Sequence, residues 1–244
     1  MLLAWRPVAP RLQNRVIAIA GAAGNLGPTV VERLAADGAT LAIAGRRQEE
    51  LDAVAGTIGG TVETASVDFL DALATRAWAD GIAERQGHVD CLVHLVGGWW
   101  PSPPIEEAPL EDWDRFEDLL VRTYQHTTQA FASHLLASGR GRVVLVSPAQ
   151  AQAPTSKNAS YAAAKAAAEA WTLALADRFR KSGSTANIVV IGGEIVTPAM
   201  REERPDHDFS TGTPAEAVAG AIAYLCGDDA ASMNGQRLSL RGAA

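Results

Sequence analysis

Tyr161 and Lys165 are the two residues of this sequence whose types and spacing best fit acid–base chemistry. They lie four positions apart in the run SYAAAKAAAEAW, and a helix places residues i and i+4 on the same face. A free phenol titrates near pKa ~10, and a neighbouring ammonium favours the phenolate and lowers that pKa. We therefore expect Tyr161, assisted by Lys165, to exchange a proton with a carbonyl–alcohol pair. The alternative is an exposed helix face that happens to carry both side chains.

A glycine-rich segment follows the first apolar run of the chain. The run 16–20 leads into AGAAGNLG and then into a pattern with helical spacing. Strand, glycine turn and helix form the arrangement that cradles a pyrophosphate on a helix N-terminus. The glycines Gly21, Gly24 and Gly27 are not spaced as GxGxxG. Asn25 stands where another glycine could be, and asparagine tolerates positive φ better than most residues. The segment predicts a nucleotide site.

The end of the second predicted strand, 40–44, indicates which nucleotide is bound. Gly45, Arg46 and Arg47 follow that strand, at the position that faces the adenosine ribose in such folds. An acid there suits the 2′-hydroxyl of NAD, whereas arginines suit the 2′-phosphate of NADP. We therefore expect NADP(H) to be favoured over NAD(H). The alternative is a solvated arginine pair that begins the next helix.

Strands and helices alternate along the rest of the chain. This pattern predicts one domain over residues 1–244, an α/β Rossmann-type doubly wound parallel sheet of about seven strands with helices on both faces. Residues 198–213 are expected to form a polar, mobile lid. Trp99 and Trp100 either wall an apolar substrate pocket or cover the edge of the core. The further expected strands are 61–67, 89–96, 142–146, 186–191 and 237–240, and the further helices are 71–85, 110–138, 159–180 and 214–226.

Composition and charge exclude several functional classes. The 244 residues are 48% hydrophobic and 20% charged, which is typical of folded globular proteins. A net charge of −7 argues against a nucleic-acid or anionic-membrane partner. Two cysteines, Cys91 and Cys226, and five scattered histidines lead us to expect neither a disulfide framework nor a metal site. The first fifteen residues lack an apolar core of signal-peptide length, so we expect a cytoplasmic protein.

Taken in order, these motifs resemble the classical short-chain dehydrogenase/reductase family over essentially the whole chain. AGAAGNLG resembles that family's TGxxxGxG loop, DCLVHLVG its DxLVNNAG strand, YAAAK its YxxxK and GGEIVTP its PGxIxTP segment. VDFLD resembles the segment whose Asp holds the adenine amino group. The resemblance implies an NADP(H)-dependent oxidoreductase of the carbonyl reductase or alcohol dehydrogenase type, acting on an apolar small molecule. It also implies a homodimer or homotetramer, for which the alanine-rich helix 159–180 permits close helix packing.

The resemblance also assigns roles to individual residues. Tyr161 becomes the general acid in reduction, and Lys165 holds the nicotinamide ribose and lowers the pKa of Tyr161. Asp68 is the adenine contact, and Thr197 contacts the nicotinamide carboxamide. The other cofactor positions that the matched motifs imply are Gly21, Asn25, Leu26, Gly27, Phe69, Gly97, Gly193 and Ile195.

The sequence departs from the family pattern at the catalytic tetrad. Pro148 stands thirteen residues before Tyr161, where the family has its catalytic Ser. Leu120 aligns with the Asn that anchors the water of a proton relay. Ser147 is one residue off, and strand alternation aims it at the opposite face unless the strand has ended. We take Ser147 as the candidate catalytic hydroxyl, since a lost hydroxyl costs about 2.7–4 kcal/mol in comparable sites.

Other substitutes and another function remain open. Thr155, Ser156 or His94 could replace the missing hydroxyl, although a histidine in a buried strand is usually a hydrogen-bonded core residue. The alternative function is a degenerate family member that binds nucleotide as a regulatory protein, or that catalyses a non-redox step such as dehydration or isomerisation. The retained Tyr161–Lys165 pair favours the redox enzyme, whereas the joint loss of Ser and Asn favours the alternative.

Overall fold

The computed structural model describes residues 11–58 and 62–240. At its centre is a seven-stranded sheet in which all neighbours are parallel, in the order β3-β2-β1-β4-β5-β6-β9. The doubly wound sheet predicted from the sequence is therefore confirmed. The strands are β1 (Val16–Ala20), β2 (Thr40–Gly45), β3 (Val62–Ser66), β4 (Cys91–His94), β5 (Arg142–Pro148), β6 (Thr185–Ile191) and β9 (Arg237–Leu240), and a separate pair is formed by β7 (Ile195–Val196) and β8 (Thr213–Pro214).

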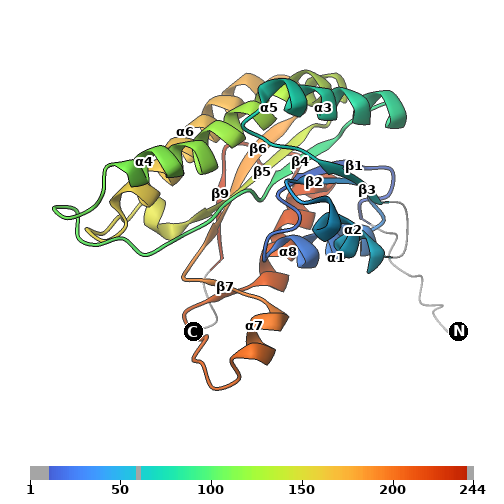
Figure 1. The fold of residues 1–244 in the computed structure, drawn as a ribbon. Helices are drawn as coiled ribbons and strands as arrows, with labels where there is room; N and C mark the ends of the chain where they lie inside the picture. Colours follow the sequence, from blue (N-terminus) through green and yellow to red (C-terminus); the bar gives the residue numbers. More distant parts are fainter. Residues whose placement is uncertain (1–10, 59–61, 241–244) are drawn as a thin grey trace, which may run out of the picture.

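Helices cover both faces of the sheet (Figure 1). Because side chains alternate along a strand, Ile17 and Ile19 pack on one face and Ala18 and Ala20 on the other, within two separate apolar cores. The first core is closed by α1 (Gly27–Ala36), α2 (Gln48–Gly56) and α8 (Ala215–Cys226), and the second by α3 (Ala72–Gln86), α5 (Thr123–Ala137) and α6 (Ala159–Phe179). The short helices α4 (Glu111–Phe116) and α7 (Pro198–Glu203) follow β4 and β7.

The order of the strands reverses at β1, which pairs with β2 on one side and β4 on the other. Ala20 is the register partner of His94, and the N–H of Leu95 donates to the carbonyl of Ala20 at 2.8 Å. The loops that leave β1 and β4 therefore begin side by side. In open α/β sheets, ligands bind outside the carboxyl ends of the strands at such a reversal. The glycine segment and the loop after His94 both lie at this edge.

The structure differs from the expected elements in a few places. The helix expected over 110–138 is interrupted by a π-helical segment, Glu117–Arg122, between α4 and α5. β5 continues through Pro148, whereas the sequence predicts a loop from Ser147. β4 covers only part of the expected strand 89–96, and Thr61 of the third expected strand lies outside the described residues. The segment 198–213 contains α7 and the first residue of β8. None of the described helices is long and apolar enough to cross a membrane.

Candidate active site

Tyr161 and Lys165 lie in the first turns of α6, beside the carboxyl end of β5. Lys165 is buried, and its Nζ donates to the carbonyl of Val146 at 3.0 Å. Burial lowers the pKa of Lys165 to about 8, and the negative charge of Glu169 acts in the opposite direction. The helix therefore presents a phenol and an amine at one edge of the sheet, as the spacing predicts.

The acidity of Tyr161 differs from the expectation. We expected the ammonium of Lys165 to lower the pKa of the phenol, but burial raises the pKa of Tyr161 to about 12. The ring lies 5.4 Å from that of Phe116, in an apolar cluster with Leu120 and Ala164. Desolvation disfavours the phenolate. In this structure Tyr161 is a protonated acid across the physiological pH range.

An aromatic wall adjoins Tyr161. The rings of Trp100 and Phe116 stack with centroids 3.7 Å apart and planes 6° apart, and the guanidinium of Arg115 lies 4.5 Å from the Trp100 ring. The indole N–H of Trp100 donates to Asp112 at 3.2 Å, which fixes the ring. Trp99, by contrast, is 62% exposed. Only Trp100 of the tryptophan pair therefore belongs to the apolar cluster that contains Tyr161.

Ser147 takes part in a buried network around Glu169. Its Oγ donates to Glu169 Oε1 at 2.6 Å. Glu169 Oε2 accepts from Gln152 Nε2 at 3.1 Å and from Arg237 Nε at 2.8 Å. Ser147 and Glu169 are each 1% exposed. Sequence reasoning missed Glu169, although its position one turn after Lys165 on the same helix was a usable signal.

The two departures from the tetrad occupy apolar surroundings. Pro148 is the last residue of β5 and pairs with Ile191 of β6. Leu120 lies in the π-helical segment, is 2% exposed, and packs in the cluster with Phe116 and Ala164. Short π-helical segments inside α-helices are frequent at functional sites. Here the widened turn directs an apolar side chain toward the cluster that contains Tyr161.

The glycine segment after β1 makes a tight turn at Gly21 rather than at Asn25. Gly21 has φ +84°, and a Cβ there would lie 2.7 Å from the backbone nitrogen of Val96. Asn25, whose residue type tolerates positive φ, does not adopt one; among the described non-glycine residues only Asn14 does. The tightest approach is at Gly27, where a Cβ would lie 1.8 Å from the carbonyl oxygen of Ala22.

The N-terminus of α1 is suited to an anion. Its N-cap residue, Leu26, supplies no side-chain cap, and the first turn contains no acidic residue. Leu26 itself is buried, while Gly24 and Asn25 are exposed at the surface of the loop. Uncapped N–H groups and the helix dipole favour a phosphate at such a position. A nicotinamide dinucleotide would fit this cradle, because no carboxylate of the first turn faces its pyrophosphate. Pro28 has no N–H and the N–H of Gly27 already donates to the carbonyl of Gly24 at 2.9 Å, so the helix dipole and the other amides of the turn would hold the pyrophosphate.

The residues expected to meet the adenosine end surround the carboxyl ends of β2 and β3. Arg46 and Arg47 are exposed, and Arg47 forms a 2.7 Å ion pair with Glu50. Asp68 is exposed, and its Oδ1 accepts from the N–H of Leu70 at 3.0 Å. The side chain of Phe69 points into the core, with its ring 5.6 Å from that of Trp78. Any contact of Phe69 with a nucleotide would therefore involve its backbone.

The residues expected at the nicotinamide end lie in the loops after β4 and β6. Gly97 is exposed. Gly193 has φ +63°, and a Cβ there would lie 2.3 Å from the carbonyl oxygen of Thr211. Ile195 pairs with Thr213 in the β7–β8 pair. Thr197 is buried and caps α7, with its Oγ1 accepting from the N–H of Met200 at 3.2 Å.

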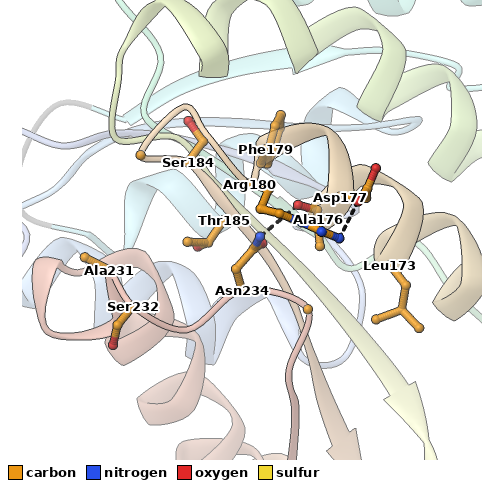
Figure 2. Close-up of a pocket in the computed structure, with 12 residues that line it drawn as sticks. Leu173, Ala176, Asp177, Phe179, Arg180, Ser184, Thr185, Ala231, Ser232 and Asn234 are labelled. Atoms are coloured by element: carbon orange, nitrogen blue, oxygen red, sulfur yellow. Dashed lines mark hydrogen bonds and ion pairs between the residues drawn. The ribbon is translucent and has the colours of Figure 1, made fainter.

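The cavity shown in Figure 2, about 440 Å³ in volume, is remote from these residues. It is lined by Leu173 of α6, by Arg180 directly after that helix, and by Thr185 and Asn234. Thr185 begins β6 and pairs with the first residue of β5. The cavity therefore lies at the amino ends of the strands, and we assign it no part in the chemistry at the carboxyl ends. Among the described residues, no group of three or more His, Cys, Asp or Glu could hold a metal ion.

Comparison with known proteins finds one family along most of the chain. A family model described as short chain dehydrogenase matches residues 15–208. D-beta-hydroxybutyrate dehydrogenase of Rhizobium meliloti is 26% identical over 254 residues, covering 94% of this chain and 98% of that protein. A solved short-chain dehydrogenase/reductase from Serratia marcescens is 27% identical, with a TM-score of 0.81 over 95% of this chain and 98% of that one. A short-chain type dehydrogenase/reductase structure from Mycobacterium ulcerans is similar in fold, with a TM-score of 0.86 at 23% identity, over 95% of this chain and 90% of that one.

Proposed function

This chain belongs to the short-chain dehydrogenase family, and we propose on that premise that it interconverts an apolar small-molecule carbonyl and its alcohol with NADP(H). It is an oxidoreductase of the family type, which uses NAD(H) or NADP(H) on small alcohols and carbonyls. The observation that carries the finer proposal is that one helix, α6, brings Tyr161 and Lys165 to the carboxyl end of β5, with an aromatic wall next to the phenol.

In this proposal Tyr161 handles the proton. With its pKa raised to about 12, the phenol is protonated at neutral pH and can donate to a carbonyl oxygen as charge develops there. Lys165, anchored on the carbonyl of Val146, is available to hold the nicotinamide ribose and to stabilise the phenolate left behind. The nicotinamide, when bound, supplies or accepts the hydride. In alcohol oxidation the same oxygen, once deprotonated, would act as the base that takes the hydroxyl proton.

The substrate preference in this proposal follows from the wall beside Tyr161. Trp100 is the partly exposed ring of this wall, and Phe116 and Leu120 are buried in the same apolar cluster next to the phenol. Aromatic rings favour stacked or edge-on contact with other apolar groups. We therefore propose an apolar, preferably aromatic, carbonyl compound rather than a strongly charged one.

The preference for NADP(H) in this proposal rests on Arg46 and Arg47. Both side chains are exposed after β2, where the adenosine ribose is held in such folds. Arginine binds phosphate oxygens through paired N–H donors. Arg47 also contacts Glu50, so the phosphate would compete with that carboxylate for one of the two guanidinium groups.

A second candidate function is a nucleotide-binding or non-redox role, and two observations favour it. The hydroxyl of Ser147 is donated to Glu169, and Leu120 fills the relay position with an apolar side chain. For Ser147 to act as the catalytic hydroxyl, as we propose, its hydrogen bond must move from Glu169 to the substrate oxygen. A protein that binds NADPH tightly but turns over no carbonyl compound would fit the second function.

The test is a steady-state assay of the purified protein with NADPH and a panel of aromatic and aliphatic carbonyl compounds. We expect turnover by the unmodified protein and its loss in Tyr161→Phe, since the phenylalanine keeps the ring and removes the proton. Tyr224→Phe is the matched control, because Tyr224 is 36% exposed on α8 and should leave turnover unchanged. Activity that survives Tyr161→Phe would remove Tyr161 from its proposed role.

The organisation of the protein is part of the same proposal. We propose a single domain over residues 1–244, a cytoplasmic location, and a homodimer or homotetramer built on α6. Ala163 and Ala170 support the assembly, because they are exposed small residues on that helix and allow another helix to approach closely. Light scattering of the purified protein tests this part independently of the chemistry.

A further inference from the structure

His94 is a buried histidine at the edge of the sheet where Tyr161 and Lys165 lie. It ends β4, is 1% exposed, and has Ala20 and Leu145 as register partners. Its ring lies 4.9 Å from that of Tyr124, and its Nδ1 is 3.1 Å from Thr127 Oγ1. Within the described part of the chain, Nε2 is buried and has no hydrogen-bond partner. A buried polar atom of this kind calls for an explanation.

The surroundings of Thr127 assign the tautomer of His94. Thr127 Oγ1 lies 3.0 Å from the carbonyl of Thr123 and 3.1 Å from that of Tyr124, both of which can only accept. A helical threonine commonly donates its one hydroxyl proton to such carbonyls. Oγ1 then faces His94 as an acceptor, so we assign the proton of the neutral imidazole to Nδ1. Nε2 is left as an acceptor.

Lys165 is a source of donors near this acceptor. Its ammonium has three N–H groups, and one of them donates to the carbonyl of Val146. Val146 follows Leu145, the register partner of His94, so the amine and the imidazole lie over neighbouring strands. The charge of Lys165 acts on His94 directly: together with burial, which is the larger cause, it lowers the pKa of His94 to about 3. His94 is therefore neutral and able to accept at physiological pH.

The two side chains make no direct hydrogen bond in the structure. We propose that His94 Nε2 accepts a hydrogen bond from the Lys165 ammonium across one water molecule, and that His94 is thereby a positioning residue for the Tyr161–Lys165 pair. The proposal deepens the proposed function, since it adds a residue to the same site. It explains the buried acceptor, and it gives Lys165 a second partner besides Val146. The imidazole also lies beside the ring of the buried Tyr124, whose hydroxyl is 2.8 Å from Thr172 Oγ1.

The first test is the tautomer of His94 in the unmodified protein. Nitrogen NMR of histidine-labelled protein distinguishes an imidazole protonated at Nδ1 from one protonated at Nε2. We expect His94 to be neutral and protonated at Nδ1 throughout the range from about pH 5 to pH 8. A proton on Nε2 would overturn the proposal, because that atom could then no longer accept from Lys165. The measurement needs neither a variant nor a substrate.

The second test measures the pKa of the Lys165 amine. The chain has only three lysines, Lys157, Lys165 and Lys181, and the other two are exposed, so carbon NMR of labelled lysine side chains can resolve Lys165. An acceptor stabilises the ammonium, and its removal in His94→Leu should lower the measured pKa of Lys165 by about one pH unit. The signals of Lys157 and Lys181 are internal controls.

A matched pair of amide variants separates the acceptor from packing. His94→Gln carries its amide near the position of Nε2, and we expect the pKa of Lys165 to return toward that of the unmodified protein. His94→Asn carries its amide near the position of Nδ1, so it should behave like His94→Leu. Equal pKa values of Lys165 in all four proteins would overturn the proposal. Both tests are read without cofactor or substrate, so their failure is distinguishable from a failure of the redox function.

Discussion

Replacing His94 by glutamine should remove a defined part of the acid sensitivity of this protein. Burial lowers the pKa of His94 from 6.5 to about 3. The unfolded chain therefore binds a proton at His94 near pH 6.5, whereas the folded protein binds it only near pH 3. The folding free energy that this difference supplies is fully present above about pH 6.5 and is lost as the pH falls toward 3.

The size of the effect follows from the difference between the two pKa values. At about 1.4 kcal/mol per pH unit, the full loss amounts to about 5 kcal/mol, and about 3 kcal/mol of it falls between pH 7 and pH 4. Small domains are stable by only about 5–15 kcal/mol. One buried imidazole should therefore account for a large share of the acid destabilisation.

The assay is urea unfolding at about pH 7 and pH 4, analysed by linear extrapolation. The quantity compared is the loss of unfolding free energy between the two pH values. His94→Gln should lose about 3 kcal/mol less than the unmodified protein over this interval, whatever its stability at pH 7. His207→Gln is the control, because His207 is exposed beside Glu194. If His94→Gln and the unmodified protein lose the same amount, the imidazole is not buried in its neutral form.

Three further predictions concern the nucleotide and substrate sites. Arg46→Asp combined with Arg47→Ala should abolish the preference for NADPH, which changes the ratio of the NADPH and NADH dissociation constants by about tenfold or more. Calorimetry with NADPH and NADH measures this ratio. An unchanged ratio would contradict the arginine assignment. Trp100→Ala should raise KM for aromatic carbonyl compounds, since a stacked ring pair contributes about 0.5–1.5 kcal/mol. The affinity for NADPH should stay the same. An unaltered KM would show that Trp100 does not contact the substrate. Gly27→Ala should weaken both nucleotide binding and stability, because its Cβ would lie 1.8 Å from a carbonyl oxygen. Gly56→Ala, at the open end of α2, is its control, and similar melting temperatures for the two variants would refute the steric argument.

The fold could be predicted from the sequence because its signals are regular. Apolar strands alternate with helical patterns, and the parallel order follows from that alternation. The π-helical segment Glu117–Arg122 could not be predicted, because one widened turn leaves the apolar pattern around Leu120 nearly unchanged. The continuation of β5 through Pro148 could not be predicted either, because a proline in the sequence usually indicates that a strand has ended.

The sequence predicts the features of the site that depend on residue spacing, but not the pKa values, which depend on burial. The Tyr161–Lys165 pair follows from helical geometry. The pKa of Tyr161 does not, because the sequence shows the neighbouring charge of Lys165 but not the desolvation in the cluster with Phe116. Asn25 was noted because its residue type tolerates positive φ, whereas the turn places that conformation at Gly21. The spacing from Lys165 could have indicated Glu169, but its partners come from β5, the loop after it and β9, and the sequence does not show those long-range contacts.

The contact between Arg237 and Glu169 has a consequence for the order in which the protein matures on the ribosome. Helix α6, with Tyr161 and Lys165, is synthesised well before β9, yet Arg237 of β9 supplies the cation that neutralises the buried Glu169 one turn beyond Lys165. A nascent chain that lacks this strand has Glu169 without the ion pair to Arg237, and breaking a buried ion pair by removing one partner is strongly destabilising. The helix that carries the chemistry should therefore settle into its final position only when the last strand has emerged and joined the edge of the sheet.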